Sequence, residues 1–221
     1  MKALARRGAE EGFWLRAEKQ SGGVGRLGRK WESPQGNLYC STLVTCRSTD
    51  PAPSSLSFVA GLAVHKAISA QISHDDIWLK WPNDILVSGL KICGILLEGS
   101  NDAVIVGIGV NIAVAPHVEG RAVTSLHQEG AASEVTAALF LETLAPIFAD
   151  TVYEWRQSGL AAILAAWQER AHPVGTRLST SNANGERMEG EYAGLFADGA
   201  LRLRKADGAL IAIHAGDVHF G

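Results

Sequence analysis

The sequence is poor in cysteine and has no long apolar run, and each absence excludes a class of protein. Its 221 residues include three cysteines, Cys40, Cys46 and Cys93, with no C-x-x-C pair. An odd number without that pairing argues against a disulfide framework and against a zinc ribbon. No apolar stretch has the length of a signal peptide or a transmembrane helix. Together these absences predict a reducing, cytoplasmic location and no membrane partner.

A surplus of charge and a transition-metal motif are also missing. The formal net charge is −3, which excludes the general basic footprint of a nucleic-acid-binding protein. Seven histidines are scattered without H-E-x-x-H or a Cys/His cluster, so His65 is expected to be a packed or surface residue. The first 31 residues nevertheless hold eight of the twenty cations, and this local excess suits a small anionic ligand. These cations are Lys2, Arg6, Arg7, Arg16, Lys19, Arg26, Arg29 and Lys30.

The run from Gly22 to Trp31 is rich in both glycine and cations. Four glycines let the backbone approach a ligand, and arginine offers a planar fork for phosphate or carboxylate oxygens. The alternative is a mobile surface loop with solvated charges. The same letters match a dinucleotide fingerprint, but that motif must open a helix, and here Pro34 and Gly36 break the following segment. The run therefore predicts an anion-binding loop and not a nicotinamide or flavin site.

Periodicity predicts an α+β chain. Helical spacing indicates a helix capped by Ser54 or Ser55 and further helices from about Ser133, interrupted by Pro146. Alternating apolar residues and short turns predict an antiparallel meander through the central strands. The expected strands cover residues 13–18, 37–46, 77–80, 84–87, 91–98 and 103–111.

The last fifty residues change character. From Pro173 they form short β segments separated by Asn184-Gly185, Asp198-Gly199 and Asp207-Gly208, a pattern typical of a small barrel. We therefore expect two domains, residues 1–171 and 172–221.

Lys80-Trp-Pro-Asn-Asp84 and Lys91 are the other candidates for chemistry. Lys91 could be an edge lysine that discourages aggregation, and Asn83-Asp84 could be simple turn residues. Beside a cationic glycine loop, they instead describe a pocket where cations neutralise a developing phosphate charge and a carboxylate helps to hold Mg²⁺.

A series of these motifs resembles the biotin protein ligase family. The motifs occur in the family's order and at similar spacing over roughly residues 3 to 111. They are Ala17-Glu-Lys-Gln20, Gly23 to Trp31, Ser33-Pro34, Gly36-Asn-Leu-Tyr39, Lys80-Trp-Pro-Asn-Asp84, Lys91-x-x-Gly-Ile-Leu-x-Glu98 and Gly107-Ile-Gly-Val-Asn111. The resemblance implies a ligase domain related to class II aminoacyl-tRNA synthetases, with a mixed and largely antiparallel sheet, followed by an SH3-like barrel.

The resemblance also implies the reaction and its residues. Biotin and MgATP would give biotinyl-5′-AMP, and a lysine of a biotin carboxyl carrier domain, such as that of acetyl-CoA carboxylase, would accept the biotinyl group. Arg26 and Lys91 would be catalytic. The biotin contacts implied are Gln20, Gly23, Val24, Gly25, Arg26 and Lys91; the ATP contacts are Arg26, Arg29, Trp31, Lys80, Asn83 and Asn111; and Asp84 would bind Mg²⁺.

Two departures and two alternatives accompany the resemblance. Val24 stands where many members have arginine, and nothing in residues 1–10 matches the family's Ser-Thr-Asn segment. We therefore expect the chain to start inside the first helix of a truncated domain and to bind biotin weakly. A DNA-binding role is not expected, and the enzyme would be a monomer or a weak homodimer. The alternatives are a lipoate or octanoate ligase, or a catalytically impaired module that binds biotin or the carrier.

Overall fold

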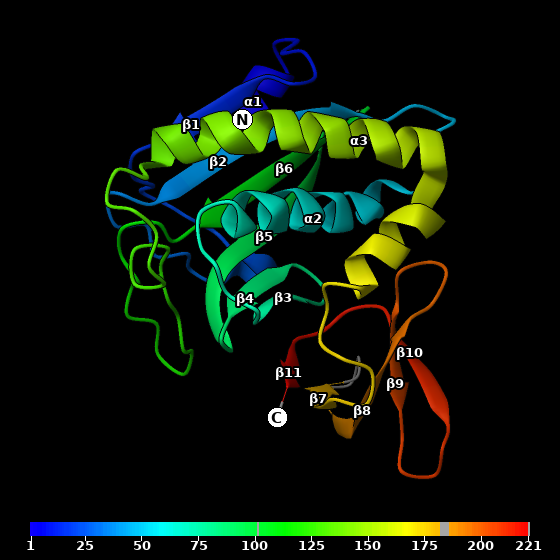
Figure 1. Ribbon diagram of the computed structural model, residues 1–221. Coiled ribbons are helices and arrows are strands. Elements are labelled where there is room, and N and C mark those ends of the chain that lie inside the picture. Colours follow the sequence, from blue (N-terminus) through cyan, green and yellow to red (C-terminus); the bar gives the residue numbers. More distant parts are fainter. Residues whose placement is uncertain (101, 182–185, 221) are drawn as a thin grey trace.

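The computed structural model describes residues 1–100, 102–181 and 186–220, and it contains two antiparallel sheets (Figure 1). The larger sheet has the order β1-β2-β6-β5-β4-β3, and every ladder in it is antiparallel. Isolated parallel bridges, Leu79 to Ala171 and Lys91 to Val123, make it mixed as expected. Its strands are β1 (Trp14–Ala17), β2 (Leu38–Thr45), β3 (Ile77–Lys80), β4 (Asp84–Val87), β5 (Leu90–Ser100) and β6 (Ala103–Val110).

Two helices cover one face of this sheet (Figure 1). They are α2 (Leu56–Ser69) and α3 (Ala137–Gln168), and their apolar side chains form one core with alternate residues of β2, β5 and β6. A short helix, α1 (Lys2–Ala5), precedes β1, and 3₁₀ turns cover Arg26–Gly28 and Pro53–Ser55. His65 packs as expected, with its Nε2 atom 3.1 Å from the carbonyl oxygen of Ile77. No helix within the described residues is both apolar and long enough to span a bilayer.

The structure corrects three local expectations about the helices. α3 begins at Ala137, because the Thr136 hydroxyl caps it by accepting from the Leu139 N–H at 3.3 Å. The helix continues through Pro146 and departs from helical geometry at Gly159 instead, where φ is +75°. Ser55 occupies the N-cap position of α2, but its hydroxyl makes no capping bond. It accepts from the indole N–H of Trp155 and donates to the Ala52 carbonyl.

The smaller sheet contains the C-terminal strands in the order β10-β9-β8-β7-β11 and agrees with the expected SH3-like fold. It packs near the end of α3 (Figure 1). The turns at Asp198-Gly199 and Asp207-Gly208 are present, whereas Asn184-Gly185 lies outside the described residues. The strands are β7 (Arg177–Ser181), β8 (Arg187–Leu195), β9 (Leu201–Arg204), β10 (Leu210–Ile213) and β11 (Val218–Phe220).

Contacts with the turn after β3 and with helices α2 and α3 hold the C-terminal strands against the larger part of the fold. The indole N–H of Trp81 donates to the Gly199 carbonyl at 3.0 Å, and the Leu195 N–H donates to the Gln168 side chain at 2.8 Å. A Cβ atom on Gly199 would lie 2.6 Å from the Phe58 ring, so only glycine allows this close approach.

Arg156 on α3 joins the segment before β1 to the end of β2. Its guanidinium donates two hydrogen bonds to the Glu11 carboxylate, at 2.6 and 2.8 Å, and one to the Thr45 carbonyl at 2.8 Å. The bond from Arg156 is the largest of the effects that lower the pKa of Glu11 below its ordinary value. Since the folded-state pKa is the lower one, this stabilisation is present above the ordinary pKa of a glutamate, and it is lost as pH falls through the folded value.

We expect Glu11→Gln to lower the free energy of unfolding by about 1 kcal/mol near neutral pH, because the pair is partly exposed and screened by solvent. The difference from the parent should be smaller at pH 3, which lies below the ordinary pKa of a glutamate. Urea unfolding at both pH values measures it. Glu10→Gln, which changes the adjacent exposed carboxylate, is the control and should show neither effect. A difference that is the same at both pH values would contradict the ionic role of Glu11.

Candidate active site

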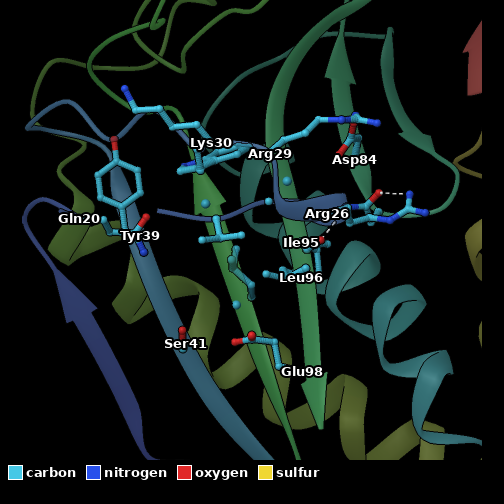
Figure 2. A pocket seen from close by; sticks show the side chains of 18 of the residues that line it. Gln20, Arg26, Arg29, Lys30, Tyr39, Ser41, Asp84, Ile95, Leu96 and Glu98 are labelled. Atoms are coloured by element: carbon cyan, nitrogen blue, oxygen red, sulfur yellow. Dashed lines mark hydrogen bonds between the residues drawn. The ribbon is translucent and has the colours of Figure 1, made fainter. Parts of the chain in front are cut away.

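A cavity of about 270 Å³ lies on the face of the large sheet opposite the helices. Alternation along β2, β5 and β6 directs Tyr39, Gly94, Leu96, Gly107 and Gly109 to this face. The glycine-rich loop crosses over these strands and forms the other wall. Figure 2 shows the loop arginines and Asp84 on one side of the cavity, and Gln20 and Tyr39 on the other. The cavity thus has a cationic end and a neutral polar end.

Glycines in the sheet make room for Trp31 of the loop. Gly94 on β5 and Gly109 on β6 are direct partners in the ladder. A Cβ atom on either would lie 2.8 or 2.7 Å from the Trp31 indole, so both positions require glycine while the ring stays there. The Lys91 Nζ atom lies 5.4 Å from the centroid of the same ring, within cation–π distance. The tryptophan therefore holds the loop against the sheet beside the candidate catalytic lysine.

The loop itself is closed by backbone hydrogen bonds. The Gly25 N–H donates to the Arg29 carbonyl at 2.7 Å, and the Trp31 N–H donates to the Gly23 carbonyl at 2.9 Å. A Cβ atom on Gly23 would lie 2.7 Å from the Gln20 side-chain oxygen and from the Trp31 carbonyl oxygen. Gly23 is therefore packed into the base of the loop and does not line the cavity, whereas Val24 and Gly25 do.

The neutral end contains Gln20, Ser33 and Tyr39. The Ser33 hydroxyl donates to the Gln20 side-chain oxygen at 3.0 Å, which leaves the Gln20 amide N–H groups to face other partners. The Tyr39 hydroxyl donates to the Pro34 carbonyl at 2.7 Å, and burial raises the pKa of this phenol to about 12. These three side chains supply neutral hydrogen bonds.

The cationic end contains Arg26, Arg29 and Lys91. Arg26 donates to the Asn83 side-chain oxygen at 3.2 Å and to the Gly216 carbonyl at 3.3 Å. Lys91 forms an ion pair with Asp84 at 2.5 Å, in which both side chains are mostly buried. The structure therefore brings together residues of the loop, of the turn between β3 and β4, and of β5. Such an arrangement can hold a carboxylate and a phosphate close together.

Two of the expected nucleotide contacts do not line the cavity. Lys80 lies beside it on β3, where burial lowers the pKa of its ammonium group and the charges of Lys91 and Arg121 act in the same direction. Asn111 is buried, and its side-chain N–H donates to the Thr124 carbonyl at 2.9 Å. Its side-chain oxygen accepts from the Asn37 side-chain N–H at 3.4 Å. In this geometry Asn111 supports the backbone of the segment 121–124 instead of facing the cavity.

The structure adds lining residues that the sequence reasoning did not select. Tyr39 belongs to a quoted motif, and its alternation with Leu38 could have identified it. Arg121 and Asp217 belong to no motif and reach the cavity only through the tertiary fold. The added lining residues with polar side chains are Lys30, Tyr39, Ser41, Glu98, Arg121 and Asp217.

Asp84 is the carboxylate that the sequence assigns to Mg²⁺, and it lies at the cationic end of the cavity. Within the described ranges no group of three or more His, Cys, Asp or Glu residues could hold a metal ion. Magnesium is commonly bound through one or two carboxylates together with substrate phosphates and water. Asp84 therefore fits an ion that arrives with a nucleotide.

Comparison with known proteins agrees with this geometry. The model of the biotin/lipoate A/B protein ligase family matches residues 4–113. A biotin--[acetyl-CoA-carboxylase] ligase of Paracoccus denitrificans is 37% identical over 218 residues, which cover 94% of this chain and 90% of that protein. The enzyme of the same name from Mycobacterium tuberculosis is 31% identical over 98% of this chain and 82% of its own length.

Solved structures show the same fold. The biotin protein ligase of Aquifex aeolicus, in complex with biotin and ATP, superimposes with a TM-score of 0.86 over 100% of this chain and 94% of that chain, at 24% identity. The match extends over both sheets, so the C-terminal strands are part of the shared fold.

Proposed function

Because the chain belongs to the biotin/lipoate A/B protein ligase family, we infer that it is an ATP-dependent biotin ligase that acts on a carrier protein. Curated relatives that match it over nearly all of its length are biotin--[acetyl-CoA-carboxylase] ligases. One observation of the structure supports this function most strongly. Residues that are far apart in the sequence line a single cavity, which offers polar hydrogen-bonding groups for a ureido ring on one side and a cationic end for phosphate.

We propose a two-step reaction within this cavity. The biotin carboxylate oxygen attacks the α-phosphorus of ATP, the bond to the bridging oxygen breaks, and pyrophosphate leaves. An uncharged amine of the carrier lysine then attacks the acyl carbon, AMP leaves with the electron pair of the broken acyl–phosphate bond, and the amine nitrogen loses a proton to solvent as the amide forms. Both steps develop charge on phosphate oxygens, and Arg26 and Lys91 at the cationic end would stabilise this charge.

The remaining roles follow from position. Gln20, Gly23, Val24 and Gly25 would surround biotin, with Gly23 acting through the shape of the loop. Arg29 and Asn83 would contact the nucleotide, and Trp31 would hold the loop closed. Asp84 would bind the Mg²⁺ that accompanies ATP. Lys80 would act by charge from outside the cavity.

We further propose a cytoplasmic enzyme with two domains, residues 1–171 and 172–221, which is a monomer or a weak homodimer and has no nucleic-acid partner. Three free cysteines, two of them buried, support a reducing compartment. A lipoate or octanoate ligase is not favoured, because the Paracoccus and Mycobacterium relatives are biotin ligases.

Intact mass measurement of a purified carrier domain tests the function. Incubation with the chain, biotin and MgATP should add one biotinyl group to the carrier. Lipoate or octanoate in place of biotin should add nothing, and a carrier whose acceptor lysine is replaced by arginine should stay unmodified. A carrier that gains lipoyl or octanoyl but no biotinyl group would establish the alternative ligase. An unmodified carrier in all reactions would indicate an impaired binding module.

A further inference from the structure

The cationic end of the cavity already contains an anion that belongs to the protein. Asp217 lies just before β11 of the small sheet, and its carboxylate forms an ion pair with Arg29. The Nη2 atom of Arg121 lies 3.9 Å from the same carboxylate oxygen. The Arg26 guanidinium donates to the carbonyl of the preceding residue, Gly216. Arginines from two distant segments thus converge on residues 216–217.

The segment that carries Arg121 is held in place by the backbone N–H and carbonyl groups of Lys91. The Lys91 N–H donates to the Ala122 carbonyl, and the Thr124 N–H donates to the Lys91 carbonyl, both at 3.0 Å. This pairing fixes the segment of Arg121 beside the catalytic strand, and the Arg121 side chain lines the cavity. Its contact with Asp217 is looser than the direct contact of Arg29. Arg121 can therefore turn to another anion without losing a tight partner.

The Asp217 carboxylate is ionised and remains partly accessible. Burial opposes its ionisation, but the hydrogen bond from Arg29 and the charges of Arg29, Arg121 and Arg26 together outweigh burial and lower the pKa. The side chain keeps 34% of its accessible surface, so it can move into solvent when another anion enters. A polyphosphate carries more negative charge than one carboxylate and offers several oxygens to arginine forks.

Resting on the proposed function, we propose that Arg121 binds the phosphates of ATP and that Asp217 is an exchangeable counter-ion, which those phosphates displace from Arg29 and Arg121. The exchange connects nucleotide binding to the C-terminal sheet, because the segment that carries Asp217 continues directly into β11. The competing interpretation is that Asp217 is a fixed support that positions the arginines. The two interpretations predict opposite signs for the loss of its charge.

Calorimetric titration of the full chain with ATP distinguishes them. Asp217→Asn should tighten ATP binding about 3- to 10-fold, because the resident competitor is removed. Arg121→Gln should weaken it about 10-fold, as expected for loss of one charge-assisted contact to phosphate. Inorganic triphosphate should reproduce both changes, whereas adenosine should show neither. Biotin affinity should stay within about 2-fold of the parent in both variants.

Glu189→Gln is the matched control for Asp217→Asn. It removes one negative charge from the same sheet, where Glu189 forms an exposed ion pair with Arg187 at 2.9 Å. ATP affinity should not change in this variant, and an equal gain in both would indicate a general effect of net charge. Thermal melting by circular dichroism shows whether each variant folds.

Weaker ATP binding in Asp217→Asn would overturn the exchange and establish the supporting role. Unchanged ATP binding in Arg121→Gln would remove Arg121 from the phosphate site, and a parent chain that does not bind ATP would overturn both assignments. These titrations do not depend on biotin transfer. If the variants show the expected ATP affinities but the chain modifies no carrier, the inference stands and the proposed function is wrong. If the chain modifies the carrier but the variants do not show these affinities, the proposed function stands and the inference is wrong.

Discussion

Lys91→Met should lower the rate of adenylate formation by about 10²- to 10³-fold, the usual cost of removing one group that stabilises developing charge in a transition state. The Lys91 ammonium lies at the cationic end of the cavity, where it pairs with Asp84 at 2.5 Å and faces the Trp31 ring. Methionine has a similar length and can occupy the same apolar surroundings. Pyrophosphate release with biotin and MgATP measures the effect.

The stability of this variant should change far less than its activity. Removal of the ammonium leaves the mostly buried Asp84 without its cation, so Lys91→Met combined with Asp84→Asn shows how much of any loss in melting temperature comes from that carboxylate. Lys30→Met is the control, because Lys30 also lines the cavity but pairs with Glu32 in solvent. Parental pyrophosphate release by folded Lys91→Met would show that Lys91 is only a strand residue.

Arg26→Gly should release biotinyl-5′-AMP about 10- to 100-fold faster than the parent, which corresponds to about 1.5–3 kcal/mol for a charge-assisted hydrogen bond to phosphate. Arg26 is suited to hold an intermediate, because its side chain is fixed by the Asn83 side chain on one side and the Gly216 carbonyl on the other. Adenylate synthesis should continue in part, because Lys91 and Arg29 remain.

Released adenylate should acylate lysines without selection. Rapid filtration after loading with labelled biotin measures the off-rate, and mass spectrometry of an added bystander protein detects the labelling. Arg26→Lys should show an intermediate rate, because lysine keeps the charge but lacks the planar fork. A variant that retains its adenylate as long as the parent and modifies only the carrier lysine would exclude a phosphate contact at Arg26.

Local pattern was sufficient to predict most strands and to locate the loop. Alternating apolar residues and turn residues predicted the strands from Ile77 to Val110, and the structure confirms them as an antiparallel meander. Pro34 and Gly36 correctly excluded a Rossmann glycine turn, because the chain after Trp31 enters β2. The limits of the helices were predicted less accurately. Thr136 and Gly159 set them through a cap and a positive φ, and Pro146 was accommodated within the helix.

The sequence by itself determined the fold class, the family motifs and several of the loop and strand residues that line the cavity, because these depend on contacts between near neighbours and on short spacings. Only the tertiary structure decided which charges share one cavity. Arg29 and Asp217 are 188 positions apart, and no periodicity connects them. Similarly, the family motif implies that Asn111 contacts the nucleotide, yet its side-chain N–H donates to the Thr124 carbonyl. This hydrogen bond supports the segment from which Arg121 reaches the cavity. Side-chain partners of this kind depend on how distant segments pack, so they emerge only once the two sheets are placed together.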